Sequence, residues 1–234
     1  MLTIDEKDNW IELLLEKLKA TFGNRLLLVM HVGSFARNDA NENSDIDINV
    51  ILDTVEFEDV LKYREIVLSM PNKHLACGFL GSKSEITSWP KFDLMAFYYG
   101  CKIVYGDISI IPNITKKEIY SNILINLSNI SHFTRHSIIY DKNIIEAARA
   151  SKELYKGAFF VIQGFYLIKQ DVYIGKRKEL LSRDIARIDK DVLNAFLNWD
   201  ENKIESEHDA LNTLKLIERW SSDMFSRLSE LNIN

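Results

Sequence analysis

Two aspartates, Asp45 and Asp47, begin an alternating stretch, DIDINVIL, at residues 45–52. Successive side chains of a β-strand point to opposite faces, so both carboxylates share one face while Ile46 and Ile48 occupy the other. Adjacent carboxylates repel and raise each other's proton affinity unless a cation lies between them. The spacing therefore predicts a divalent metal site. Mg²⁺ suits it, because this ion prefers hard oxygen ligands and completes its shell with phosphates.

A glycine and a serine, Gly33 and Ser34, end the apolar run RLLLVMHV of residues 25–32. A glycine at the end of a strand lets the backbone approach a ligand closely, and exposed N–H groups with a serine hydroxyl can hold phosphate oxygens. We therefore expect Gly33 and Ser34 to bind a triphosphate tail, and the two aspartates to hold the metal that bridges it.

The stretch VGSFARNDANENSDIDINV at residues 32–50 resembles the pattern of the nucleotidyltransferase superfamily, in which Gly-Ser, a spacer and Asp-x-Asp lie between hydrophobic residues. The resemblance implies a small mixed sheet flanked by helices, ATP bound with Mg²⁺, and transfer of a nucleotidyl group to an acceptor hydroxyl with pyrophosphate leaving. It also implies that Arg37 stabilises the phosphates. An exposed arginine in a salt bridge is the alternative interpretation of Arg37.

The order of an α/β half and a helical half resembles, more loosely, aminoglycoside nucleotidyltransferases. This likeness implies a small hydroxylated acceptor, an NTP co-substrate and a cleft with one wall from each half. ATP is the expected NTP, and the residues do not distinguish it from GTP or CTP. Many two-domain transferases of this kind form homodimers, so a second copy of the chain is among the expected partners. Two other functions compete: a minimal nucleotidyltransferase of the antitoxin kind that modifies a partner protein, and a nucleotide-binding module with weakened chemistry. Minimal forms are much shorter, which argues against the first.

Members of the superfamily commonly carry a third carboxylate on a later strand. The corresponding segment here, KHLACGFLG at residues 73–81, contains no acid, and the aligned position is Ala76 or Gly78. Glu85 and Asp93 are the nearest acids, and both fall in expected helical or loop segments. The absence of a third carboxylate from this segment is the basis of the hypothesis of a nucleotide-binding module with weakened chemistry.

Without a third carboxylate, a residue of the helical half could act as the general base. The segment SHFTRHS places His132, Arg135 and His136 on one face of an expected helix. Histidine has an ordinary pKa suited to general base catalysis, so His132 and His136 are candidate catalytic residues. A polar stripe on a bundle helix is the alternative.

Hydrophobic periodicity predicts an α+β protein with a boundary near residue 112, hence domains 1–112 and 113–234. The first is expected to open with an amphipathic helix capped by Thr3 and to combine strands with helices. The second is expected to be a bundle of four or five helices. The expected strands are 25–32, 45–52, 73–81 and 101–107, and the main expected helices are 3–21, 56–69, 115–139, 144–170, 177–198 and 204–231.

Composition limits the partners. The net charge of −5 argues against a general nucleic-acid surface. The two cysteines, Cys77 and Cys101, are expected to be small buried hydrophobic residues. No secretory signal pattern and no apolar run near the ~18 residues of a membrane span is visible, so a cytoplasmic protein without membrane contact is expected.

Overall fold

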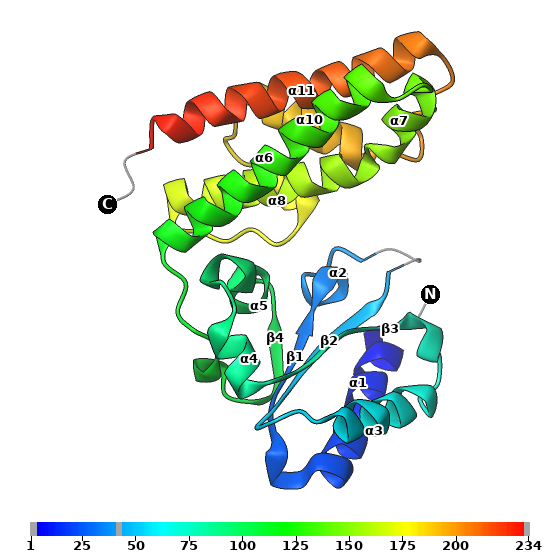
Figure 1. The fold of residues 1–234 in the computed structure, drawn as a ribbon, viewed down its shortest axis with the longest axis vertical. Helices are drawn as coiled ribbons and strands as arrows, with labels where there is room; N and C mark the ends of the chain where they lie inside the picture. Colours follow the sequence, from blue (N-terminus) through cyan, green and yellow to red (C-terminus); the bar gives the residue numbers. More distant parts are fainter. Residues whose placement is uncertain (1–3, 41–43, 232–234) are drawn as a thin grey trace. The chain divides into compact units, whose positions relative to one another are not determined.

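The computed structural model describes residues 4–40 and 44–231. The chain divides into two compact units, Met1–Ile114 and Thr115–Asn234 (Figure 1). Each unit is considered by itself below. The expected cap at Thr3 lies outside the described residues.

The first unit is built on a four-stranded sheet with the order β3-β2-β1-β4. Its strands are β1 (Leu26–Val32), β2 (Ile46–Leu52), β3 (Ala76–Ser82) and β4 (Lys102–Gly106). β1 runs antiparallel to β2 and β4, whereas β2 and β3 are parallel. A mixed sheet accompanied by helices confirms the expected α+β class. The third strand begins at Ala76 rather than Lys73, because residues 73–75 form a 3₁₀ turn.

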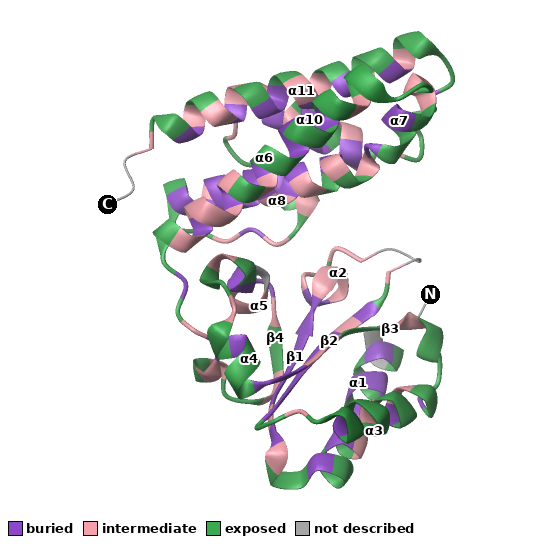
Figure 2. Cartoon of the chain, viewed as in Figure 1, coloured by how far each residue is buried: buried purple, intermediate pink, exposed green. Residues whose placement is uncertain are grey.

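Helices cover both faces of this sheet (Figure 1). The helices and 3₁₀ turns of the unit are α1 (Ile4–Phe22), η1 (Gly23–Arg25), α2 (Gly33–Ala36), α3 (Phe57–Leu68), η2 (Lys73–Leu75), α4 (Lys83–Ser88), η3 (Lys91–Leu94), α5 (Met95–Tyr99) and η4 (Ile108–Ile110). On one face, Leu14 and Leu18 of α1 belong to the same core as Ile46 and Ile48 of β2. This core contains the fully buried face of β2 that the alternating sequence predicts, and β1 and β2 accordingly show mostly buried residues in Figure 2.

Aromatic residues of β3, of α5 and of the position that follows α4 pack together on the opposite face. The rings of Phe79 and Trp89 have centroids 4.9 Å apart, and those of Trp89 and Phe97 are 5.8 Å apart. Phe79 lies beside Asn49 in the sheet, so this is the face that Asp47 shares. The carboxylate of Asp47 therefore points away from the core that α1 forms with β2.

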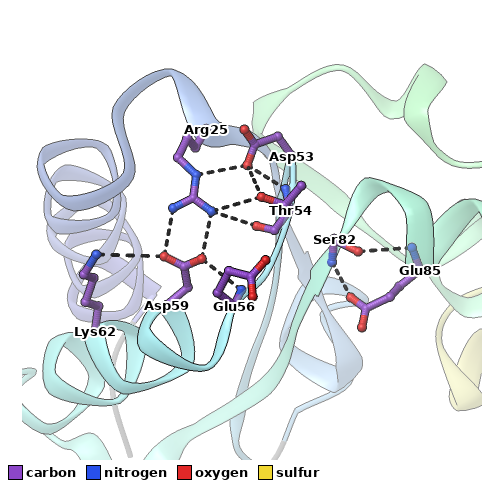
Figure 3. Close-up of polar contacts among 8 residues, drawn as sticks. All are labelled: Arg25, Asp53, Thr54, Glu56, Asp59, Lys62, Ser82 and Glu85. Carbon is purple, nitrogen blue, oxygen red and sulfur yellow. Dashed lines mark hydrogen bonds and ion pairs between the residues drawn. The ribbon is translucent and has the colours of Figure 1, made fainter.

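An ion-pair network around Arg25 joins the start of β1, the loop after β2 and α3 (Figure 3). The Arg25 guanidinium donates to both carboxylate oxygens of the buried Asp59, at 2.8 and 2.7 Å, and to Asp53 at 3.1 Å. These bonds hold the pKa of Asp59 near 2, chiefly because Arg25 stabilises the carboxylate. The network stabilises the end of the β1–β2 pair that lies away from Asp47.

The described residues of the second unit form helices joined by loops, and the strands given above all lie in the first unit. Its helices are α6 (Lys116–Tyr140), α7 (Ile144–Ala150), α8 (Lys152–Gln170), α9 (Arg177–Leu181), α10 (Arg187–Leu197) and α11 (Glu207–Ser229). No helix among the described residues has both the length and the apolar character needed to cross a bilayer.

Two of the expected long helices are interrupted. The segment 144–170 breaks at Ser151, whose hydroxyl donates to the carbonyl of Ala148 at 2.6 Å and competes with the helical hydrogen-bond pattern. The segment 177–198 breaks between α9 and α10, where Ala186 is extended with φ −57° and ψ 147°. Both breaks preserve apolar periodicity on either side, which is why periodicity alone predicts continuous helices.

Candidate active site

The end of β1 runs into a tight turn, the β1–α2 turn (residues 33–37), which lies directly against Asp47. Gly33 has φ +74°, a left-handed conformation that favours glycine. A Cβ added there would overlap Oδ2 of Asp47, so the turn and the carboxylate approach more closely than any other residue type allows. Val32 pairs with Asp47 across the strands, which fixes this approach in the sheet.

The two aspartates lie at the start of β2 with the alternation that the sequence predicts. Asp45 is exposed just before the strand and Asp47 is half-buried within it, while Ile46 and Ile48 are buried on the core face. The described residues contain no cluster of three or more His, Cys, Asp or Glu side chains able to hold a metal. A pair of carboxylates still fits Mg²⁺, which keeps several waters and takes one or two carboxylates plus substrate phosphates.

Asn49 is a third polar residue on the Asp47 face, and sequence reasoning missed it. Its side chain is 2 % exposed, and its Nδ2 has no hydrogen-bond partner among the described residues. Asn49 lies between Met30 and Phe79 in the sheet. The alternation that identified Asp45 and Asp47 extends to Asn49, so the signal was present in the sequence.

The position next to Asp47 on β3 is Cys77, not Ala76. In the parallel register Asp47 pairs with Cys77, while Ala76 pairs with Ile46 and packs on the core side. The Cys77 thiol is in hydrogen-bond contact with Asp47, and its pKa is raised by desolvation first and then by the Asp47 carboxylate. The alignment of the missing acid with Ala76 is therefore wrong by one residue, which in a strand is the opposite face.

The expectation that both cysteines are buried is also wrong, since Cys77 is exposed and Cys101 is partly exposed. Cys77 lies on an edge strand, where the helices of the unit cover less of the chain. The alternative alignment at Gly78 is excluded as well. Gly78 has φ +135°, and a Cβ there would overlap the carbonyl oxygen of Ile48.

The two substitute acids lie elsewhere. Glu85 accepts a hydrogen bond from the Ser82 N–H at 2.6 Å, and Ser82 Oγ accepts from the Glu85 N–H, so this pair caps α4 (Figure 3). Asp93 is exposed in η3. A carboxylate equivalent to the family's third acid is therefore not found on β3, where Cys77 occupies the neighbouring position.

Comparison with known proteins adds a decisive observation. Residues 11–76 match the family model described as a nucleotidyltransferase domain, and this range includes the β1–α2 turn and both aspartates. Residues 11–76 are therefore similar to a nucleotidyltransferase domain. The match confirms the expected nucleotidyltransferase class of enzyme. No curated protein has a significant sequence match to the chain.

A solved structure shares the fold over both units of the chain. It is the crystal structure of the spectinomycin adenyltransferase AAD(9) from Enterococcus faecialis with ATP and spectinomycin. The TM-score is 0.52 at 14 % sequence identity, and the alignment covers 94 % of this chain and 100 % of that one. At this identity the likeness concerns the fold alone, and the alignment extends over the helical unit as well as the sheet-containing unit.

Ser34 and Arg37 complete the β1–α2 turn. The Ser34 carbonyl accepts the N–H of Asp39 at 2.9 Å, and the Gly33 carbonyl accepts that of Arg37 at 3.3 Å. Both side chains are half-buried. Their assignment to phosphate binding stays a prediction.

His132 and His136 lie on α6 in the helical unit, with ring centroids 6.1 Å apart and both side chains exposed. Together with Arg135 they line an open hollow of about 420 Å³. Arg135 donates to Glu218 at 3.0 Å, and Tyr140 lines the same hollow as the two histidines. The structure brings the two histidines together as predicted, and their catalytic role stays a prediction.

Proposed function

We propose that the protein transfers a nucleoside monophosphate from an NTP, ATP in the first instance, to a hydroxyl of a small aminoglycoside-like molecule in a Mg²⁺-dependent reaction. One observation carries the proposal. Gly33 in the β1–α2 turn packs against Asp47 so closely that a phosphate held by the turn would lie beside the carboxylate. The family match over residues 11–76 supports the same chemistry.

The residues have separate roles in this proposal. The N–H groups and hydroxyl at Gly33 and Ser34 bind the triphosphate, and Arg37 neutralises part of its charge. Asp45 and Asp47 are the metal ligands. When bound there, Mg²⁺ would stabilise the charge on the entering and departing oxygens of the α-phosphate. The acceptor oxygen forms the new bond to phosphorus while the bond to the bridging oxygen breaks, and pyrophosphate leaves with that electron pair. The proton of the acceptor hydroxyl passes to a general base or to water.

The choice of ATP and of the acceptor rests on the similar structure, which was solved with ATP and spectinomycin. Pyrophosphate release with MgATP tests it across spectinomycin, other aminoglycosides and simple polyols. We expect acceptor-dependent release with at least one aminoglycoside-like compound. Release with GTP or CTP but not ATP would correct the co-substrate, and the absence of release with every NTP and acceptor would overturn the transferase proposal.

Replacing Asp47 with Asn tests the metal assignment. The substitution preserves the shape of the side chain and removes a charge needed to hold the cation, so Mg²⁺-dependent ATP binding should be lost while the thermal unfolding midpoint changes little. Isothermal titration with MgATP measures the effect, and the exposed Asp93→Asn is the matched control. Equal MgATP affinities for Asp47→Asn and the parent protein would refute the metal site.

A nucleotide-binding module with weakened chemistry is the second candidate, and Cys77 favours it. A thiol stands beside Asp47 where a third carboxylate would be placed. This candidate predicts MgATP binding without pyrophosphate release. The titration and the release assay together therefore separate the two functions.

A further inference from the structure

Lys7 on α1 is a buried cation that the catalytic proposal does not use. The residue is only 4 % exposed, although lysine is almost never fully buried without a partner. Among the described residues the carboxylate that reaches its Nζ is that of Asp8, 4.0 Å away on a side chain that is itself 63 % exposed. Such a distant and solvated partner offsets little of the cost of burying an ammonium group.

The surroundings of Lys7 belong to the β1–α2 turn. Its Nζ lies 5.1 Å from the centroid of the Phe35 ring, within the range of a cation–π interaction. Phe35 follows Ser34 directly in the turn and packs on the α1 side of the sheet. Lys7 therefore supports the turn from behind, on the side opposite to Asp47.

The positive charge of Lys7 also affects the pKa of His31, near the end of β1. His31, two residues before Gly33, is 3 % exposed, and its Nε2 has no hydrogen-bond partner among the described residues. Burial lowers the pKa of His31 to about 4, and the positive charges of Lys7 and Lys102 lower it further, against a small opposite effect of Asp8. His31 is therefore neutral at pH 7, and the ammonium of Lys7 is the buried charge behind the turn.

We infer that Lys7 is a positioning residue for the triphosphate: it holds the β1–α2 turn through Phe35 and attracts the phosphates that bind on the other side. A buried cation is costly in the free protein, and a bound polyanion reduces that cost because the intervening medium screens the attraction weakly. The inference rests on the proposed function, since it concerns the phosphates of that nucleotide. It adds α1, which lies before the Gly-Ser motif in the chain, to the binding site.

Replacing Lys7 with Met tests the inference, because methionine keeps the length and apolar stem while removing the charge. We expect MgATP affinity to fall about tenfold, MgADP affinity to fall less, and adenosine affinity to stay unchanged. Lys7→Arg should keep most of the MgATP affinity. Lys19→Met is the matched control, since Lys19 lies on the same helix with its Nζ 4.6 Å from the Tyr105 ring. It should change none of these affinities.

A second measurement needs no nucleotide. The pKa of His31, followed by NMR in the parent and in Lys7→Met, should rise when the charge is removed. The inference would be overturned if Lys7→Met left the pKa of His31 or the MgATP affinity unchanged. Equal losses of affinity for ATP, ADP and adenosine would also overturn it, because they would indicate a purely structural role. If the parent protein bound no nucleotide, the proposed function itself would be refuted. The NMR titration of His31 would still measure the electrostatic effect of Lys7 in that case.

Discussion

At the scale of single residues, the site depends on a contact between a glycine and a carboxylate. Gly33 satisfies two independent demands, a positive φ and room for Asp47. A second glycine in the same unit, Gly23, has φ +53° but nothing within 4 Å of an added Cβ. Substitutions at these two glycines can therefore distinguish the effect of backbone strain, which both share, from the effect of the close contact with Asp47, which only Gly33 makes.

We predict different outcomes for Gly33→Ala and Gly23→Ala. Both should lose about 1 kcal/mol of unfolding free energy from the strained φ. Only Gly33→Ala should also displace the Asp47 carboxylate and reduce turnover, by at least about tenfold, since catalytic groups tolerate little misplacement. Urea unfolding and pyrophosphate release measure the two effects. If both variants lose activity equally, the Gly33–Asp47 contact has no special role.

At the scale of elements, the register of β2 and β3 decides which residue can replace the family's third acid. Cys77 shares the face of Asp47, whereas Ala76 lies beside the buried Ile46. The sequence offers Ala76 and Cys77 as neighbours and does not distinguish them. The pairing of two parallel strands does.

Cys77→Asp should raise the Mg²⁺-dependent turnover by about tenfold or more, because a carboxylate beside Asp47 can act as a base or further ligand. Ala76→Asp is the matched control. It places the acid toward the core, so it should lower stability without raising turnover. Steady-state pyrophosphate release at saturating Mg²⁺ decides between them. A gain from Ala76→Asp, or none from a well-folded Cys77→Asp, would contradict the register argument.

The Arg25 network predicts an acid-dependent loss of stability. The pKa of Asp59 is lowered from 3.8 to about 2, so its contribution is complete above pH 4 and is lost as the pH falls towards 2. Because Arg25 is partly exposed, we expect Asp59→Asn to cost about 1–2 kcal/mol at pH 5 and much less at pH 2. Urea unfolding at both pH values measures this difference. Asp93→Asn serves as the control, and a cost for Asp59→Asn that is the same at both pH values would contradict the assignment.

At the scale of the whole molecule, the open question is what the helical unit contributes to the chemistry. It carries two exposed histidines one helical turn apart on α6, in the hollow shared with Arg135. A third exposed histidine of the same unit, His208 on α11, lies outside that hollow. The three allow a matched comparison.

If His132 or His136 is the general base, the double replacement by Gln should reduce turnover by roughly 10²–10⁴-fold. It should also change how turnover depends on pH, because a general base must be unprotonated to accept the proton of the acceptor hydroxyl. His208→Gln should do neither. Equal profiles for the double variant and His208→Gln would remove the histidines from the mechanism and leave positioning and metal electrostatics as its basis.

The sequence by itself determined the features that depend on local periodicity. Alternation at residues 45–50 places the two aspartates on one face and Ile46 and Ile48 in the core, and Gly33 ends β1 as predicted. Side-chain direction in a strand follows from the chain's own geometry, so no partner is needed to predict it. The same pattern contained Asn49, which was overlooked.

Only the tertiary structure decided which distant residues meet these groups. The register that brings Cys77 rather than Ala76 beside Asp47, and the packing that buries Lys7 behind Phe35, join segments about 30 residues apart in the chain. Hydrophobic patterning shows which residues are apolar, and a shift of one position in a glycine- and cysteine-containing edge strand changes that pattern little. Contacts between elements are set by the packing of the whole unit, and they therefore decided the neighbours of the site.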